Sequence, residues 1–317
     1  MLDKKYDLVS IGEIMVDMTQ IGVNSQGNPL FAAYSGGSPA NIAVAASRLG
    51  AKTAFIGRIG GDLLGQGLRE VLQQNGVDDS AVSVDPTAPT TIAMVTVDEE
   101  GKRDYIYLRH SAADIQLSVS DLPDGMIEQA KILHFGSVSM TCEPTRSATL
   151  EAVARAQRSG ALLSFAPRFK PALWENVESG IELIRSLIPR CEILRLSREE
   201  MVLFTGTANY AQGSAQLAEM GPFLVLVTLG EDGVFYRMGS LTGHVAAQKI
   251  VVSDTFGAGS TFMGAVLSKL SRMEDPHTID QKALEEVLYF ANTAAGITTS
   301  RPGAIPAMPT LEEVISY

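Results

Sequence analysis

Residues 254–260 read DTFGAGS, a run of small residues between two apolar segments. Residues 248–252, before this run, have the character of a strand, and residues 261–267, after it, have the character of a helix. Small residues at a strand-to-helix turn let backbone N–H groups face an anion, and the N-terminus of the helix adds partial positive charge. The stretch therefore predicts a turn that stabilises a phosphate group.

The segments on both sides of this turn alternate between strand and helix. Apolar strands are predicted at residues 8–12, continuing outward through 14–18, and at 53–57, with helices at 40–49 and 65–76. The pattern resumes later, with strands at 132–135, 162–165, 193–196, 223–228 and 234–237, and with helices at 144–158, 175–187 and 283–299. This alternation predicts an α/β fold with a central, mostly parallel sheet covered on both faces.

One segment breaks the alternation. Residues 90–97 and 103–109 are rich in Thr, Val, Tyr and Ile and flank the turn-like residues 98–101, which predicts an antiparallel hairpin. A hairpin fits poorly inside a parallel sheet, so we expect a small separate sheet, a lid, formed by approximately residues 14–35 and 88–115. Since no linker, repeat or low-complexity stretch interrupts the sequence, we expect one domain over residues 1–317 that carries this lid.

The composition argues against several classes of partner. At 317 residues, 45% hydrophobic and 19% charged, the chain suits one large α/β domain with an appendage or two small domains. A net charge of −11 argues against nucleic acid and anionic membrane surfaces as partners. The first residues lack the apolar core of a signal peptide, and no apolar run approaches the roughly 20 residues that cross a bilayer. Cys142 and Cys191 are too few for a disulfide framework and the histidines are scattered, so we expect a cytoplasmic protein with reduced cysteines.

A second glycine-containing stretch, residues 34–43, reads YSGGSPANIA. Its paired glycines, Gly36 and Gly37, let a polar ligand approach the backbone closely. Asn41, in the first turn of the following helix, offers both a donor and an acceptor. On local grounds, a tight turn that starts a helix explains the stretch equally well.

The second strand of the predicted hairpin carries a polar and aromatic face. Tyr105, Tyr107 and Arg109 share this face because alternate residues of a strand point the same way. The face is either the underside of the lid, with Arg109 suited to a polar or acidic substrate, or an exposed surface with ordinary cross-strand pairing.

These stretches resemble the signatures of the ribokinase-like (PfkB) carbohydrate kinases, Gly-Gly-x-x-x-Asn-x-Ala and Asp-Thr-x-Gly-Ala-Gly-Asp. Residues 226–233 (LVTLGEDG) resemble the nucleotide-edge motif of that family, and residues 301–309 (RPGAIPAMP) resemble the C-terminus of its fructokinase-like members. The resemblance implies a three-layer ribokinase-like fold. It also implies transfer of the γ-phosphate of ATP to a primary hydroxyl of a sugar or sugar acid, as in fructokinase or 2-keto-3-deoxygluconate kinase.

The resemblance also implies roles for particular residues. Ser260 stands at the position of the family's catalytic base, in a turn with Gly257, Ala258 and Gly259. The implied sugar contacts are Asp17, Gly36, Gly37, Asn41, Tyr107, Arg109, Arg168 and Lys170. The implied nucleotide contacts are Thr228, Gly230, Gly233 and Asn292, and Glu200 is expected to organise Mg²⁺ through water. ATP and Mg²⁺ are thus the expected cofactors, and a homodimer formed through the lid is also expected.

The chain departs from the family pattern in its catalytic segments. Ser260 replaces the Asp that acts as base in the family. In residues 164–174 (SFAPRFKPALW), which resemble Phe-Asp-Pro-Asn-x-Arg-x-x-Leu-Trp, Ala166 takes the place of Asp, Arg168 of Asn and Lys170 of Arg. In residues 195–200 (RLSREE), the acid of the family's Asn-x-x-Glu element is kept and Ser197 stands where Asn is frequent.

These departures predict an impaired kinase. A serine hydroxyl is not basic near neutral pH, and the loss of a general base costs about 10²–10⁴ in rate. Loss of the carboxylates at positions 260 and 166, together with the added charge of Arg168, makes the site more cationic, which favours phosphate binding and weakens metal binding. The alternatives are a catalytically inactive sugar- or nucleotide-binding pseudokinase and an engineered variant of an active kinase. A nucleoside kinase is a weaker third alternative, against which Arg109 and the fructokinase-like C-terminus count.

Overall fold

The structure is a computed structural model that describes residues 4–97 and 103–317. A nine-stranded sheet forms its centre, in the order β13-β12-β11-β10-β9-β8-β1-β4-β5. The strands are β1 (Tyr6–Ile11), β4 (Thr53–Gly60), β5 (Asp78–Asp85), β8 (Ala130–Phe135), β9 (Leu162–Phe165), β10 (Ile193–Ser197), β11 (Leu224–Thr228), β12 (Val234–Met238) and β13 (Leu241–Val245). Pairing is parallel from β5 through β11, and antiparallel where β12 joins β11 and β13 joins β12.

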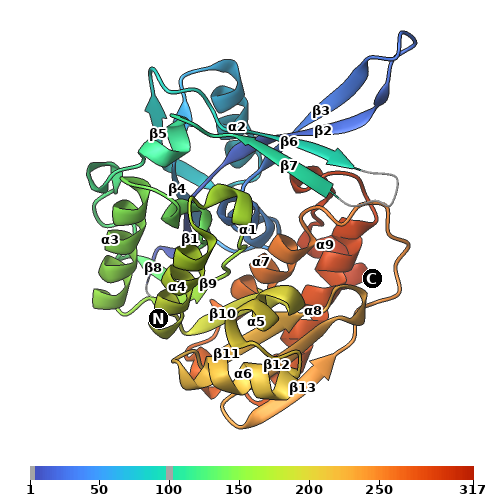
Figure 1. Cartoon of the computed structure of the whole chain (residues 1–317). Helices are drawn as coiled ribbons and strands as arrows, with labels where there is room; N and C mark the ends of the chain where they lie inside the picture. The colour runs from blue at the N-terminus through green and yellow to red at the C-terminus, as the bar shows by residue number, and fades with distance from the viewer. Residues whose placement is uncertain (1–3, 98–102) are drawn as a thin grey trace.

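Helices cover both faces of this sheet (Figure 1). One face packs against α3 (Thr145–Arg158), α4 (Val177–Leu187), α5 (Arg198–Thr205) and α6 (Tyr210–Glu219). The other packs against α1 (Ser38–Arg48), α2 (Leu63–Gln74), α7 (Ala258–Leu270), α8 (Gln281–Thr299) and α9 (Leu311–Ser316). In β1, Val9 and Ile11 enter the first core and Leu8 enters the second, because successive side chains of a strand point to opposite faces. The expected three-layer α/β fold is confirmed.

A second, four-stranded sheet lies over one edge of the main sheet (Figure 1). Its order is β3-β2-β6-β7, with β2 (Met15–Val23), β3 (Pro29–Gly36), β6 (Ile92–Val97) and β7 (Arg103–Leu108). The predicted antiparallel pairing of β6 with β7 is confirmed, while the turn predicted at residues 98–101 lies outside the described residues. β2 pairs antiparallel with β3 and parallel with β6, so the segments expected to form the lid do form one sheet.

The structure corrects several secondary-structure predictions. Residues 248–252, predicted as a strand, run as irregular backbone along the surface, and Val251 is 90% exposed. β5 and β13 were not predicted, since residues 78–85 and 241–245 contain charged, Gly and Ser residues that weaken a strand signal. Among the described residues, no helix is both long and apolar enough to cross a membrane. Cys142 and Cys191 are both free thiols.

Candidate active site

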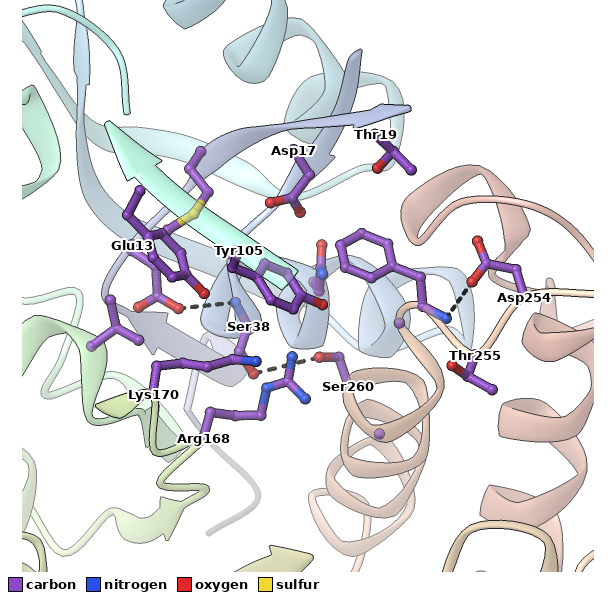
Figure 2. A pocket seen from close by; sticks show the side chains of 18 of the residues that line it. Glu13, Asp17, Thr19, Ser38, Tyr105, Arg168, Lys170, Asp254, Thr255 and Ser260 are labelled. Atoms are coloured by element: carbon purple, nitrogen blue, oxygen red, sulfur yellow. Dashed lines mark hydrogen bonds between the residues drawn. The ribbon is translucent and has the colours of Figure 1, made fainter. Parts of the chain in front are cut away.

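A cavity of about 720 Å³ lies between the lid sheet and the N-terminus of α7. It opens where the parallel strands end, the usual location of ligand sites in α/β sheets. Figure 2 shows Asp17 and Thr19 above it on the lid strand, Arg168 and Lys170 on the opposite side, and Ser260 at the start of α7. The structure therefore brings together residues that lie far apart in the sequence. The predicted site residues that line this cavity are Asp17, Gly37, Asn41, Tyr107, Arg168, Lys170, Gly257, Gly259 and Ser260.

The signature turn is held in place by Asp254. Its Oδ1 accepts a hydrogen bond from the Phe256 N–H (2.9 Å), and its Oδ2 accepts one from the Gly303 N–H (3.0 Å). Gly257 then adopts a left-handed conformation (φ 83°), which a residue with a Cβ adopts with strain, and α7 begins at the next residue. Gly257, Gly259 and Ser260, at the start of α7, line the cavity, and a loop leads into this turn where a strand was predicted.

Ser260 lies in the first turn of α7 and is almost fully buried. Its Oγ is 3.4 Å from Oγ of Ser38, the first residue of α1, so the N-termini of two helices meet at a pair of hydroxyl groups. The partial positive charge of both helix ends favours an anion at this point.

The wall formed by β2 and α1 carries polar groups suited to hydroxyls. Asp17 projects from β2, and Gly36 makes room for it: a Cβ on Gly36 would lie 1.8 Å from Oδ2 of Asp17. Gly36 therefore lets Asp17 approach, and it is not among the residues that line the cavity. Asn41 presents an Oδ1 atom that is buried and has no hydrogen-bond partner among the described residues. Together, Asp17 and Asn41 offer acceptors to a polyhydroxylated ligand.

Glu13 is a site residue that the sequence interpretation missed. It follows β1, lines the cavity, and is 3% exposed. Its Oε1 accepts a hydrogen bond from the Ser38 N–H (3.0 Å), and its Oε2 is buried without a partner in the described part of the chain. Burial raises the pKa of its carboxyl from the usual 4.5 to about 7. The signal in the sequence was an acid directly after the first strand, four residues before Asp17.

The opposite wall is basic. Arg168 has a positive φ (51°), which is uncommon for a residue with a side chain, and it lines the cavity together with Lys170. The Lys170 ammonium group lies 4.3 Å from the centre of the Tyr105 ring, which stacks on Tyr107 with ring centres 6.0 Å apart. The underside of the lid therefore meets the basic wall through a cation–π contact.

Arg195 lies beneath this basic wall. Its Nη2 donates to Oγ1 of Thr228 (2.6 Å), while its buried Nε has no partner among residues 4–97 and 103–317. Burial lowers the pKa of its guanidinium to about 10. Phe165, the residue before Ala166, pairs with Leu194, the residue before Arg195, in the parallel ladder between β9 and β10. The carboxylates of Glu200 and Glu199 are the negative charges that act on the pKa of Arg195 in the opposite direction to burial.

The structure corrects the placement of Arg109. Its side chain does not share the tyrosine face but turns away after β7 into a buried cluster. Its Nε donates to Oδ2 of Asp114 (2.8 Å), and its other nitrogens donate to Oγ1 of Thr141 (2.7 Å) and to the carbonyl of Val138 (3.1 Å). Arg109 therefore braces the cavity wall at Val138 and is not positioned as a sugar contact.

Glu200 is likewise engaged by the protein itself. Its Oε1 accepts from the Phe169 N–H (2.8 Å) and its Oε2 accepts from the Ser197 N–H (2.8 Å), which forms the capping box of α5. The carboxylate thus fixes the loop that carries Arg168 and Lys170. Within the described ranges, no group of three or more His, Cys, Asp or Glu side chains is arranged to hold a metal ion. The donor set of the basic wall fits a phosphate and does not fit Mg²⁺ held directly by carboxylates.

A second cavity, of about 1350 Å³, adjoins the first. The two share Val252 and Thr255, at the start of the signature turn. Of the predicted nucleotide contacts, Gly230 and Asn292 line this second cavity, as does Ala258 of the signature. The Asn292 amide donates to the carbonyls of Val245 (2.9 Å) and Ala246 (3.2 Å) and so holds the wall of the cavity in place.

Two other predicted nucleotide contacts lie behind this lining. Thr228 holds Arg195, and a Cβ on Gly233 would lie 2.2 Å from the carbonyl oxygen of Val245, so Gly233 allows β12 and β13 to close. Gln248, in contrast, lines the cavity with an Oε1 atom that lacks a partner in the part of the chain described, while its Nε2 donates to Oγ1 of Thr293 (2.8 Å). A buried acceptor in a cavity of this size fits a nucleotide base with an amino group.

Comparison with known proteins identifies the class to which this fold and these two adjoining cavities belong. The model of the pfkB family carbohydrate kinases matches residues 5–311, and the chain belongs to this family. The chain is 38% identical over 312 residues to fructokinase-1 of Oryza sativa subsp. japonica, covering 97% of this chain and 96% of that protein. It is 39% identical over 313 residues to probable fructokinase-4 of Arabidopsis thaliana, covering 98% and 95%.

Solved structures agree with this assignment. The fructokinase of Xylella fastidiosa with bound ATP has a TM-score of 0.90 and 30% identity, with 98% of each chain covered. A double mutant of Vibrio cholerae fructokinase, solved with fructose, ADP and potassium ion bound, has a TM-score of 0.89 and 27% identity, with 100% of this chain and 99% of that chain covered. The expected ribokinase-like fold and the fructokinase-like character of the chain are thus confirmed.

Proposed function

We propose that this chain is an ATP-dependent, fructokinase-like kinase that transfers the γ-phosphate to a primary hydroxyl of a sugar, with a slow transfer step. One observation carries the proposal: two cavities meet at Thr255, at the N-terminus of α7, where Ser260 also lies. One cavity suits a polyhydroxylated ligand and the other suits a nucleotide. Their junction is where a hydroxyl and a terminal phosphate would meet.

The chain's own residues account for ligand positioning. Asp17 and Asn41 accept hydrogen bonds from sugar hydroxyls, and the lid tyrosines cover the sugar and exclude water. The N–H groups at the start of α7, with Arg168 and Lys170, stabilise the negative charge on the transferred phosphate. Mg²⁺, when it accompanies the nucleotide, neutralises phosphate charge. Since Arg168 and Lys170 supply positive charge at the same place, we propose that nucleotide binding depends weakly on Mg²⁺.

The transfer step is proposed to be slow because of Ser260 and Ala166. Ser260 replaces the carboxylate that would accept the proton of the sugar hydroxyl, at a cost of about 10²–10⁴ in rate. Ala166 adds no carboxylate to the basic side of the cavity, where the buried Nε of Arg195 has no hydrogen-bond partner among the described residues.

A pseudokinase that binds sugar and nucleotide without turnover is the second candidate. Two observations favour it: Ser260 stands at the helix start, and backbone N–H groups already engage both oxygens of the Glu200 carboxylate. The two candidates share their ligands and differ in chemistry.

A thermal-shift screen of sugars and nucleotides, run beside a coupled ADP-release assay, separates the candidates. We expect D-fructose and ATP each to raise the melting temperature and to give slow, fructose-dependent ADP formation. Stabilisation by both ligands without ADP formation would identify the pseudokinase. Failure of every sugar and nucleotide to stabilise the protein would refute both. Calorimetry of ATP binding with and without Mg²⁺ tests whether nucleotide binding depends weakly on Mg²⁺. We expect Mg²⁺ to change the ATP affinity by less than about tenfold, or 1.4 kcal/mol.

We further propose a homodimer through the lid. Ile106 and Leu108 are 59% and 56% exposed and face away from the lid tyrosines, because alternate residues of β7 point to opposite sides. Exposed apolar residues on one sheet face suit association with a second copy. Light scattering of the wild type and of Ile106→Glu tests this: a dimer that the variant abolishes supports it, and a monomeric wild type contradicts it.

A further inference from the structure

Glu13 occupies a position that the roles above do not use. Its carboxyl lies between β1 and α1 on the cavity wall, with Oε1 held by the Ser38 N–H at 3.0 Å. Its Oε2 is buried and without a partner in the described residues. Only Oε1 is engaged by the Ser38 N–H, so Oε2 is available to accept a proton.

Ser38 connects Glu13 to the junction of the two cavities. The backbone of Ser38 contacts the Glu13 carboxylate, and its Oγ lies 3.4 Å from Oγ of Ser260 (Figure 2). Rotation about χ1 moves Ser38 Oγ between staggered positions, and the relay requires the one that brings Oγ from Ser260 to the Glu13 carboxyl. Ser38 is thus the residue that touches both Ser260, at the N-terminus of α7, and the buried carboxyl of Glu13.

The charges around Glu13 leave this carboxyl able to titrate near neutral pH. Burial raises its pKa to about 7, while the hydrogen bond from Ser38 and the positive charge of Arg109 act in the opposite direction. Asp114, which is paired with Arg109, raises it further. Asp17 on β2 and Tyr107 on β7 face the same cavity. A base with a pKa near the working pH is well suited to proton transfer, whereas the hydroxyl of Ser260 is not basic.

We propose that Glu13 is the proton acceptor for phosphoryl transfer in this chain, reached through the hydroxyls of Ser260 and Ser38. In this step an oxygen lone pair of the sugar hydroxyl forms the bond to the γ-phosphorus. The bond from the γ-phosphorus to the bridging oxygen breaks, and its electron pair leaves with the nucleoside diphosphate. The hydroxyl proton passes to Ser260, the Ser260 proton passes to Ser38, and the Ser38 proton passes to Glu13. The proposal rests on the sugar-kinase function proposed above.

The principal experiment compares the wild type with Glu13→Gln, which keeps an oxygen to accept from the Ser38 N–H and removes the titrating group. Fructose-dependent ADP formation is measured from pH 5.5 to 8.5. We expect the wild-type kcat to fall at low pH with an apparent pKa near 7. We expect Glu13→Gln to lower kcat about 10²-fold, at the low end of the range for a general base, and to remove this pH dependence.

Two matched variants separate proton transfer from a structural role. Ser38→Ala keeps the N–H that holds Glu13 and removes the hydroxyl, so it should lower kcat with little change in D-fructose affinity. In a Ser260→Asp/Ala166→Asp background, Glu13→Gln should cause a much smaller fall in kcat, because the introduced carboxylate takes the proton directly. An equal fall in both backgrounds would show that Glu13 acts through structure, and would overturn the proposal.

A Glu13→Gln variant with the kcat and pH profile of the wild type contradicts the proposal. A wild type without turnover, beside an active Ser260→Asp/Ala166→Asp variant, overturns the role of Glu13 and leaves the sugar-kinase site intact. Absence of fructose binding in all variants refutes the proposed function itself.

Discussion

The two walls of the sugar-side cavity have opposite electrostatic character. The wall formed by β2 and the start of α1 presents Glu13, Asp17 and Asn41, which are acceptors for hydroxyl protons. The wall formed by the loop after β9 presents Arg168 and Lys170, with Arg195 buried below. The first wall suits a neutral polyol and the second suits a phosphate. Under the proposed function, ligand recognition and phosphoryl transfer therefore depend on separate parts of the chain.

The largest expected effect comes from restoring carboxylates to the basic side. Ser260→Asp with Ala166→Asp should raise kcat by about 10²–10⁴, the range for a general base. Ser260→Asp without the second change should recover little, because position 166 still lacks the carboxylate that we expect on the basic side of the site. Steady-state ADP release gives the kcat of the single variant and of the double variant. If the single variant already equals the double variant, the role assigned to Ala166 is wrong.

The second effect concerns the free energy of unfolding and the buried ion pair between Arg109 and Asp114. Arg109→Ala leaves Asp114 buried without its ion-pair partner (2.8 Å), which typically costs about 3–5 kcal/mol of unfolding free energy. Denaturant unfolding of the variant should show this loss. Arg109→Ala/Asp114→Ala, which removes both charges, should recover part of the stability. A stable Arg109→Ala variant with weakened fructose binding would instead indicate that Arg109 contacts the sugar.

The third effect is a dependence of stability on pH through Glu13. Its pKa in the folded protein is raised from 4.5 to about 7, so its favourable contribution is complete below pH 4.5 and is lost as the pH rises through 7. The loss is on the order of 3 kcal/mol, from 1.36 kcal/mol per pKa unit. Relative to the wild type, Glu13→Gln should therefore gain stability between pH 4 and pH 8 in urea unfolding. A constant difference between the two proteins over this range would mean that Glu13 has an ordinary pKa.

The smallest effect concerns the acidic wall. Asp17→Ala should weaken D-fructose binding by about 1.5–3 kcal/mol, or roughly ten- to a hundred-fold, with ATP affinity nearly unchanged. The matched control is Thr19→Ala, on the same strand and the same wall. Calorimetry with each ligand in turn decides the result. Loss of both ligands would indicate misfolding, and unchanged fructose affinity would place the sugar elsewhere.

The sequence predicted the fold and the general position of the site well, and side-chain placement less well. Apolar strands and glycine-rich turns have strong local signals, so the three layers, the antiparallel pairing of β6 with β7 and the helix after Gly257 were predicted correctly. Arg109 was misplaced because it lies just beyond the end of β7, where the alternation of strand side chains no longer applies. Its guanidinium instead donates a hydrogen bond to Asp114. Glu13 and Arg195 were missed because their significance arises from contacts between distant segments, with Ser38 and Thr228 respectively. Local patterns therefore identified the elements of this site, while tertiary contacts determine which side chains face the cavity.

The turnover number of the wild type with saturating D-fructose and ATP tests the central claim most directly, provided that fructose binding is measured on the same sample. The account predicts measurable fructose binding with a kcat at least tenfold below the roughly 1–100 s⁻¹ that is typical of kinases. A kcat within that range would contradict the claim that the loss of carboxylates on the basic wall limits phosphoryl transfer.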